Sequence, residues 1–118
     1  GEYAMKSISD IELSDGESEI LHKIKGAVNS VLPDATVIFF GSRARDDARE
    51  NSDWDILVLT EAVDWKIERR VFSALYQVEL DEDIVIGLLV LTRNEWDYKP
   101  YRDHPLHDLV EAEGVLVA

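Results

Sequence analysis

Apolar and polar positions follow two different periods along the chain, and each change of period marks a new helix or strand. From Glu17 to Leu32 the apolar residues recur every three or four positions, which predicts an amphipathic helix. The same spacing predicts a second helix over about Asp64 to Val78 and a shorter one over Leu106 to Glu113. The polar segment Ser42 to Glu50 is compatible with a further helix, which Ser42 could cap.

Three short runs rich in β-branched and aromatic residues predict strands. They are Thr36–Phe40, Asp53–Leu59 and Ile84–Leu91. The last run is apolar at nearly every position, which is typical of a strand covered on both faces. Val115–Val117 either adds an edge strand or docks in the core. We expect the large aromatic side chains to lie in that core, namely Trp65, Phe72, Tyr76 and Trp96.

The order of these elements predicts an α/β fold in which a small mixed sheet has its helices mainly on one face. With 118 residues, 46% of them hydrophobic, the chain is long enough for one domain with one core. We expect that domain to span residues 5–118. Gly1 to Ala4, ahead of Met5, are expected to be a remnant of an expression tag.

Charge and cysteine content exclude several classes of function. Twenty-five acidic against 12 basic residues give a net charge of −13, which repels nucleic-acid phosphates and anionic membranes, so neither is expected as a partner. The chain has no cysteine, which excludes disulfides, thiolate metal sites and a cysteine nucleophile, and fits a cytoplasmic location. Its longest apolar run, Ile84–Leu91, is far shorter than the roughly 20 residues of a membrane-spanning helix.

The candidate chemistry lies between the first two predicted strands. Gly41 and Ser42 join a strand to a predicted helix, where free backbone N–H groups, a hydroxyl and a helix dipole can hold phosphate. Asp53 and Asp55 are two positions apart on a strand, so their carboxylates lie on the same face and can bind a hard cation such as Mg²⁺. A phosphate-binding turn beside a carboxylate pair suits phosphoryl or nucleotidyl transfer.

At these residues the sequence resembles the minimal nucleotidyltransferases of the polymerase-β superfamily. Their hallmark is Gly-Ser, ten residues and then Asp-x-Asp, and here Arg43 to Ser52 supply the ten residues. The Gly-Ser-Arg-Ala-Arg opening and the serine before the first aspartate also match. The close of the chain, from His104 to Val115, is similar to the end of such domains.

The resemblance implies a cofactor, a substrate and partners. Gly41 and Ser42, with Arg43 beside them, would bind a nucleoside triphosphate, most plausibly ATP, while Asp53 and Asp55 would hold Mg²⁺ or Mn²⁺. Nucleoside monophosphate would pass to an acceptor hydroxyl and pyrophosphate would leave. Stand-alone domains of the family often pair with a helical HEPN-type protein, sometimes as antitoxins that transfer AMP to it. Such a partner, or a homodimer, would complete the acceptor site.

One family feature is absent from its usual place. The family usually carries a third carboxylate on the next strand, where it serves as metal ligand and general base. In this chain the interior of that strand, Ile84–Val90, has no acidic residue, and Asp83 at its entrance is the candidate. Glu79 and Asp81 share its parity but lie further back. Asp46 also stands where the family often has glycine.

Other interpretations stay open. Arg43 and Arg45 could pair with nearby acids instead of phosphate, and the three histidines, His22, His104 and His107, suit surface or packing roles. The main alternative function is a catalytically degenerate module that binds nucleotide or a protein without transfer. A third possibility is nucleotidylation of a small molecule such as an aminoglycoside, with a second subunit completing its pocket.

Overall fold

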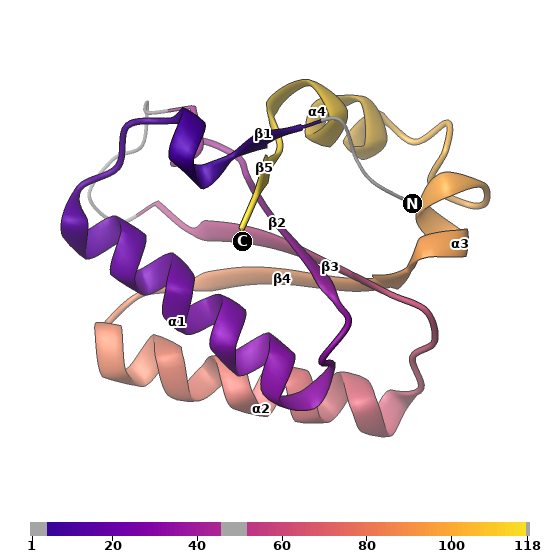
Figure 1. The fold of residues 1–118 in the computed structure, drawn as a ribbon. Helices are drawn as coiled ribbons and strands as arrows, with labels where there is room; N and C mark the ends of the chain where they lie inside the picture. The colour runs from indigo at the N-terminus through magenta and orange to yellow at the C-terminus, as the bar shows by residue number, and fades with distance from the viewer. Residues whose placement is uncertain (1–4, 46–51, 118) are drawn as a thin grey trace.

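The computed structural model describes residues 5–45 and 52–117, which form a five-stranded mixed sheet with helices on both faces (Figure 1). The strand order is β1-β5-β2-β3-β4. β2 is antiparallel to β3 and β5, while β4 is parallel to β3 and β1 is parallel to β5. The strands are β1 (Lys6–Ser7), β2 (Thr36–Phe40), β3 (Trp54–Thr60), β4 (Ile86–Thr92) and β5 (Val115–Leu116).

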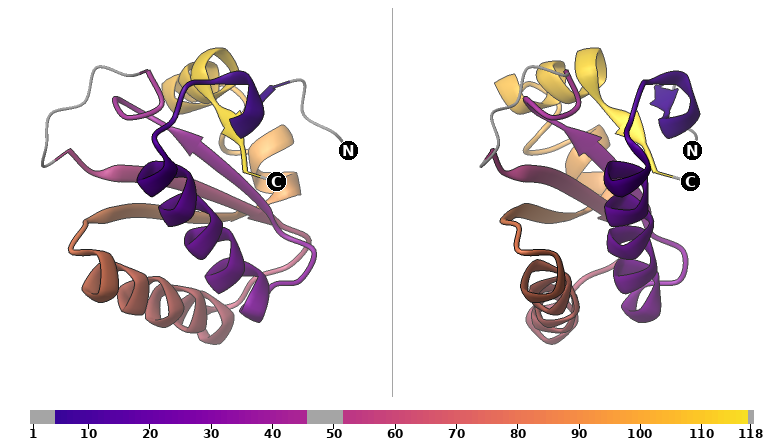
Figure 2. Two further views of the ribbon diagram at one scale, coloured as in Figure 1. Left: turned by 60° about the vertical axis from the view of Figure 1, so that its left-hand side comes forward. Right: turned by 90° about the vertical axis from the view of Figure 1, so that its left-hand side faces the viewer.

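The two long helices lie side by side and antiparallel against one face of the sheet (Figures 1 and 2). They are α1 (Asp15–Val31) and α2 (Trp65–Glu82). The shorter α3 (Arg93–Asp97) and α4 (Pro105–Glu113) contribute to a second core on the other face, and the 3₁₀ helix η1 (Ile8–Asp10) follows β1. The mixed sheet and the long helices on one face confirm the expected fold class.

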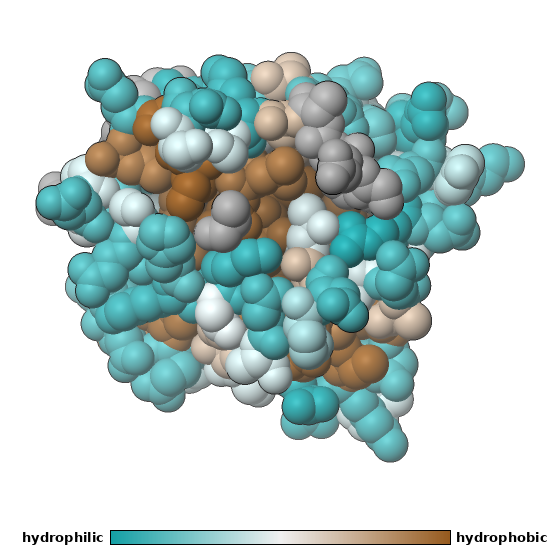
Figure 3. All heavy atoms as spheres, viewed as in Figure 1, coloured by the Kyte–Doolittle hydropathy of each residue, from teal (hydrophilic) through white to brown (hydrophobic). Residues whose placement is uncertain are grey.

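Local sequence accounts for where the helices begin. Ser14 and Glu17 form a reciprocal capping box at α1, in which the Ser14 hydroxyl accepts from the Glu17 backbone N–H. Asp64 caps α2 by accepting from the backbone N–H of Ile67, and Thr92 caps α3 in the same way. Figure 3 shows the hydrophilic outer surface of α1, with apolar atoms gathered above it.

Each face of the sheet has its own core because side chains alternate along a strand. On β3, Trp54, Ile56 and Val58 pack toward α1 and α2, whereas Leu57 and Leu59 pack toward α3 and α4. Trp96 is fully buried in the second core, as expected, and its ring stacks on that of His107 at 4.4 Å. His107 therefore has the packing role that its sequence context favours.

Several expectations need correction. Trp65, Phe72 and Tyr76 are not in the core: they are 64%, 46% and 59% exposed on α2. α2 also runs one turn beyond Val78, because its last backbone groups are capped only at Asp83, whose backbone N–H donates to the Glu79 carbonyl.

The strand boundaries also differ in part from the expected ones. β4 begins at Ile86 rather than Ile84, since the two preceding residues connect the helix cap to the strand. β5 lies inside the sheet, and the two-residue β1, which has no periodicity to reveal it, forms the edge. Residues 42–45 form a turn, and the rest of the helix expected over Ser42–Glu50, including Asp46, lies outside the described residues.

Candidate active site

The two aspartates of the motif lie at the start of β3, on the face that also carries α3 and α4. Trp54 between them points into the opposite core, where its ring stacks on Phe39 with centroids 5.6 Å apart. Asp53 is exposed and Asp55 is partly buried. The alternation expected from the sequence therefore places both carboxylates on one face, as a shared cation site requires.

The Asp55 carboxylate lies between two glycines. In the sheet register Asp55 pairs with Phe40 on β2, which precedes Gly41, and with Gly87 on β4. A Cβ on Gly41 would overlap the Asp55 carboxylate, and a Cβ on Gly87 would lie 2.8 Å from its Oδ1. A side chain larger than hydrogen at Gly41 or Gly87 would occupy the space that this carboxylate fills.

Gly41 also has the backbone conformation that turns the chain at the end of β2. Its φ of 84° lies in the left-handed region, where residues with a Cβ are strained. Its carbonyl accepts from the backbone N–H groups of Ala44 and Arg45, both at 3.1 Å, which closes a tight turn. The turn therefore places Gly41 against Asp55, with Ser42 next in the chain, while phosphate binding by these residues stays a prediction.

The surroundings of Asp55 favour a cation. Burial raises the pKa of the Asp55 carboxyl above its ordinary value, repulsion from Asp53 raises it further, and attraction to Arg45 lowers it in part. A carboxylate that is partly desolvated beside a second carboxylate is stabilised by positive charge. Arg45 supplies some of that charge from the turn.

Arg43 holds the ends of the loop between β2 and β3. Its Nε donates to the Ser52 carbonyl at 2.8 Å, and its guanidinium lies over the Trp54 ring, 4.8 Å from the centroid. These contacts connect the Gly41 turn to the start of β3. The structure thus gives Arg43 a positioning role, while its direct contact with nucleotide stays a prediction.

Replacing Arg43 with lysine should loosen this loop. Lysine keeps the charge but lacks the planar group that stacks on Trp54 and the Nε that bonds to Ser52, so we expect the free energy of unfolding to fall by about 1 kcal/mol. Arg45→Lys is the matched control: its ion pair with Glu113 is partly exposed, and we expect a change within about 0.5 kcal/mol. Urea denaturation measures both, and equal effects would contradict the role of Arg43.

Arg45 also links the turn to α4. Its Nη1 lies 2.8 Å from Oε2 of Glu113, the last residue of that helix. Sequence reasoning missed Glu113 because the two residues are 68 positions apart. Gly87 was missed as well, although a glycine within an apolar strand is a recognisable signal of close approach by another group.

Asp83 serves as the left-handed cap of α2. It has φ 54° and ψ 53°, its backbone N–H donates to the Glu79 carbonyl, and its side chain is exposed. The Glu79 carboxylate accepts from the backbone N–H of Ile86 at 2.7 Å. Within residues 5–45 and 52–117, no three carboxylate or histidine side chains gather as a metal site would need. Asp83 as the third ligand stays a prediction.

The donor set of the site fits a hard divalent cation. Asp53 and Asp55 offer carboxylate oxygens on one face, which are the ligands that Mg²⁺ and Mn²⁺ prefer. Burial and the charge of Asp53 raise the pKa of Asp55 because both disfavour its negative charge. A bound cation would offset both effects, so the raised pKa agrees with a cation site.

Comparison with known proteins agrees with this geometry. A family model described as "Nucleotidyltransferase domain" matches residues 21–103. This chain belongs to the nucleotidyltransferase family. The chain is also 32% identical over 102 residues to the protein named "Putative protein adenylyltransferase" from Methanocaldococcus jannaschii, covering 84% of this chain and 96% of that relative.

The region of the chain that the family model matches contains every residue of the candidate site except Glu113. Both β2 and β3, the Gly41 turn and the Asp53–Asp55 pair fall inside it, whereas α4 and β5 lie beyond it. None of the helices within the described residues is both long and apolar enough to cross a membrane.

Proposed function

We propose that this nucleotidyltransferase transfers AMP from ATP to a hydroxyl group on a partner protein. One observation supports the proposal: the Asp55 carboxylate lies against Gly41, the first residue of the Gly-Ser turn, so that a carboxylate able to bind a cation adjoins the turn expected to bind phosphate. The relative from Methanocaldococcus jannaschii, named "Putative protein adenylyltransferase", supports adenine as the base and a protein as the acceptor.

The proposal assigns a role to each part of the site. The backbone N–H groups and hydroxyl of the Gly41–Ser42 turn bind the β- and γ-phosphates, and Arg43 contributes through the loop that it positions. Asp53 and Asp55 hold Mg²⁺ or Mn²⁺. When bound, such a cation neutralises phosphate charge and lowers the pKa of the acceptor hydroxyl.

The bonds that change are those at the α-phosphorus. The acceptor oxygen forms a bond to the α-phosphorus, the bond from that phosphorus to the α–β bridging oxygen breaks, and pyrophosphate leaves with the electron pair. The hydroxyl proton passes to a carboxylate of the site, for which Asp83 is the candidate. Arg45, which is attached to α4 through Glu113, can balance negative charge beside Asp55.

The acceptor is proposed to be a separate protein. A net charge of −13 favours a basic partner surface, and a helical HEPN-type protein is the first candidate because minimal domains of this family often pair with one. Acceptor recognition by a second copy of the chain is the alternative within the same proposal.

A second function has its own supporting observation. Asp83 is an exposed helix cap, and β4 itself has no acidic residue, so the site can be complete for binding yet incomplete for transfer. The chain would then act as a module that binds nucleotide and a partner without chemistry.

Transfer of label separates the two functions. The purified protein is incubated with ATP labelled at the α-phosphate, Mg²⁺ and a candidate partner, and label on the partner is quantified. We expect label with the unaltered chain, less than about one hundredth of it with Asp53→Ala, and an unchanged level with Asp34→Ala, a matched control in the loop before β2. Equal labelling by all three would refute transfer at this site.

Asp83→Asn tests the third carboxylate in the same assay. Asparagine tolerates the left-handed conformation of a helix cap, so the fold should survive and only acid–base or metal chemistry should change. Loss of label supports a catalytic carboxylate, whereas full label assigns Asp83 to the cap alone. Nucleotide binding without label in the unaltered chain, measured by calorimetry, identifies the non-catalytic module.

A further inference from the structure

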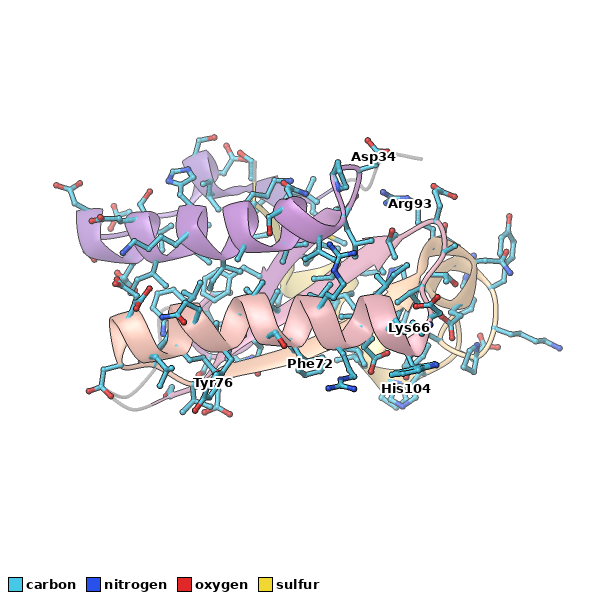
Figure 4. All side chains as sticks on the ribbon, turned by 90° about the horizontal axis from the view of Figure 1, so that it is seen from below. Asp34, Lys66, Phe72, Tyr76, Arg93 and His104 are labelled. Carbon is cyan, nitrogen blue, oxygen red and sulfur yellow. The ribbon has the colours of Figure 1, made fainter. Side chains whose placement is uncertain are left out.

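An apolar stripe runs along the outer side of α2. It consists of Trp65, Phe72, Tyr76 and Leu80, which are between 46% and 64% exposed. Their spacing places them on one side of the helix, since intervals of seven and four residues return to nearly the same direction. Figure 4 shows Phe72 and Tyr76 on the side of α2 that points away from α1. This α2 stripe is not needed to pack the monomer.

The stripe adjoins a free sheet edge. Among the described strands β4 is the last of the sheet and pairs only with β3. Its seven residues, Ile-Gly-Leu-Leu-Val-Leu-Thr, include no charge and no proline, the usual protections of an exposed edge. Trp65 and Phe72 line a hollow of about 450 Å³ together with Leu88 and Leu89 of β4. The α2 stripe and the β4 edge therefore form one continuous surface.

Charge along α2 changes sign from one end to the other. The first half carries three basic residues, Lys66, Arg69 and Arg70, against one acid, Glu68. The second half and its cap carry only acids, Glu79, Asp81, Glu82 and Asp83, of which Glu82 pairs with Lys23 of α1. A helix of this kind is complementary to an antiparallel copy of itself and repels a parallel copy.

We propose that two copies of this chain associate through the surface formed by the α2 stripe and the β4 edge. A two-fold axis near Leu89, the midpoint of β4, pairs the two β4 strands antiparallel and extends the sheet across both copies. The same axis sets the two α2 helices antiparallel, about one helix diameter apart, with the stripes in contact and the basic half of each beside the acidic half of the other. The proposal does not depend on the chemistry at Asp55.

The arrangement keeps the candidate active sites separate. Asp55 lies on the face of the sheet opposite α2, and Gly87 would pair across the axis with Leu91 of the partner subunit. Each copy thus retains its own Gly41 turn, and the interface covers the surface that α2 leaves exposed.

Sedimentation equilibrium tests the association. We expect the unaltered chain to be dimeric at a concentration of about 100 µM. We expect Tyr76→Lys to raise the dissociation constant of the dimer at least about tenfold. Tyr98→Lys is the matched control, because Tyr98 is 66% exposed but belongs to neither α2 nor β4: it is the C-cap residue of α3, whose Trp96 packs on the other face of the sheet. Circular dichroism verifies that both variants fold. A monomeric unaltered chain would overturn the proposal and would indicate that a different protein covers this surface. A dimer that Tyr98→Lys disrupts and Tyr76→Lys does not would also overturn it.

Disulfide trapping tests the axis itself. Since the chain has no cysteine, Leu89→Cys introduces a single thiol at the proposed axis, where two antiparallel strands bring equivalent Cα atoms to about 5 Å. We expect nearly complete cross-linking under mild oxidation, and little for Tyr98→Cys. A Leu89→Cys dimer in solution that fails to cross-link would show that β4 does not pair with its copy.

Discussion

Gly41→Ala is expected to reduce nucleotide transfer at least about 100-fold and to lower the free energy of unfolding by about 1–3 kcal/mol. Two independent causes act at this position. Alanine is strained at the φ of 84°, and its Cβ would overlap the Asp55 carboxylate. The backbone has little room to move away, because Phe40 before it is paired with Asp55 in the sheet. Alanine at position 41 therefore displaces either the Gly41 turn or the Asp55 carboxylate, and a shift of either one disturbs the candidate site.

A helical glycine provides the matched control for this substitution. Gly26 lies on the exposed side of α1, and a Cβ there would meet no atom within 4 Å. Gly26→Ala should therefore leave transfer unchanged and raise stability by about 0.5–1 kcal/mol, the usual gain of alanine over glycine in a helix.

The contribution of the clash can be separated from that of strain. In an Asp55→Ala background the carboxylate is absent, so Gly41→Ala should then cost only the backbone strain, and the coupling between the two substitutions should be about 1 kcal/mol or more. Purely additive effects in denaturation would show that Gly41 and Asp55 act independently.

The centre of the fold could be predicted because each of its residues obeys a local rule. β2 and β3 combine β-branched residues with clear limits at Gly41 and Thr60, and the period of two along β3 places Asp53 and Asp55 on one face. α1 has a complete capping box at Ser14. The Gly-Ser motif follows β2 and the Asp-x-Asp motif lies at the start of β3, and these two strands are neighbours in the sheet, with Phe40 opposite Asp55.

Elements that depend on distant contacts could not be read in the same way. β1 has two residues and pairs with β5, more than one hundred positions later, so no local pattern identifies it. The aromatic residues of α2 were expected in the core because large apolar side chains are usually buried, yet they are exposed. The sequence alone does not show whether such side chains pack inside their own chain or against another protein. The contact between Arg45 and Glu113 has the same origin, since only the folded chain brings the two together.

Asp55→Asn is expected to abolish transfer, with at least about a 100-fold loss, and yet to stabilise the cation-free protein. The folded chain raises the pKa of the Asp55 carboxyl, chiefly by burial and then by repulsion from Asp53. Below the ordinary pKa of 3.8 the group is protonated in both the folded and the unfolded chain and contributes no difference. As the pH rises above that value, the unfolded chain loses its proton first, so ionisation of Asp55 progressively destabilises the fold.

The destabilisation is complete once the pH exceeds the pKa of Asp55 in the folded chain, and the neutral asparagine removes it. We expect Asp55→Asn to be more stable than the unaltered chain by up to about 1 kcal/mol at pH 7 in the presence of chelator, a modest value because solvent screens a partly exposed carboxylate. The difference should shrink toward pH 4. Denaturation of both proteins across this pH range measures it, with Asp34→Asn as the control that should follow the unaltered chain at every pH.

Addition of Mn²⁺ should reverse the order of stability. A cation that binds only the folded chain stabilises it by about 1.4 kcal/mol at ten times its dissociation constant, and the asparagine variant lacks the charge that would hold it. The unaltered chain should then unfold at a higher temperature than Asp55→Asn. If Mn²⁺ raised both transitions equally, the cation would bind elsewhere. Asp55 would then destabilise the cation-free fold and stabilise the cation-bound fold. This reversal would show that the carboxylate serves binding at this site rather than folding stability.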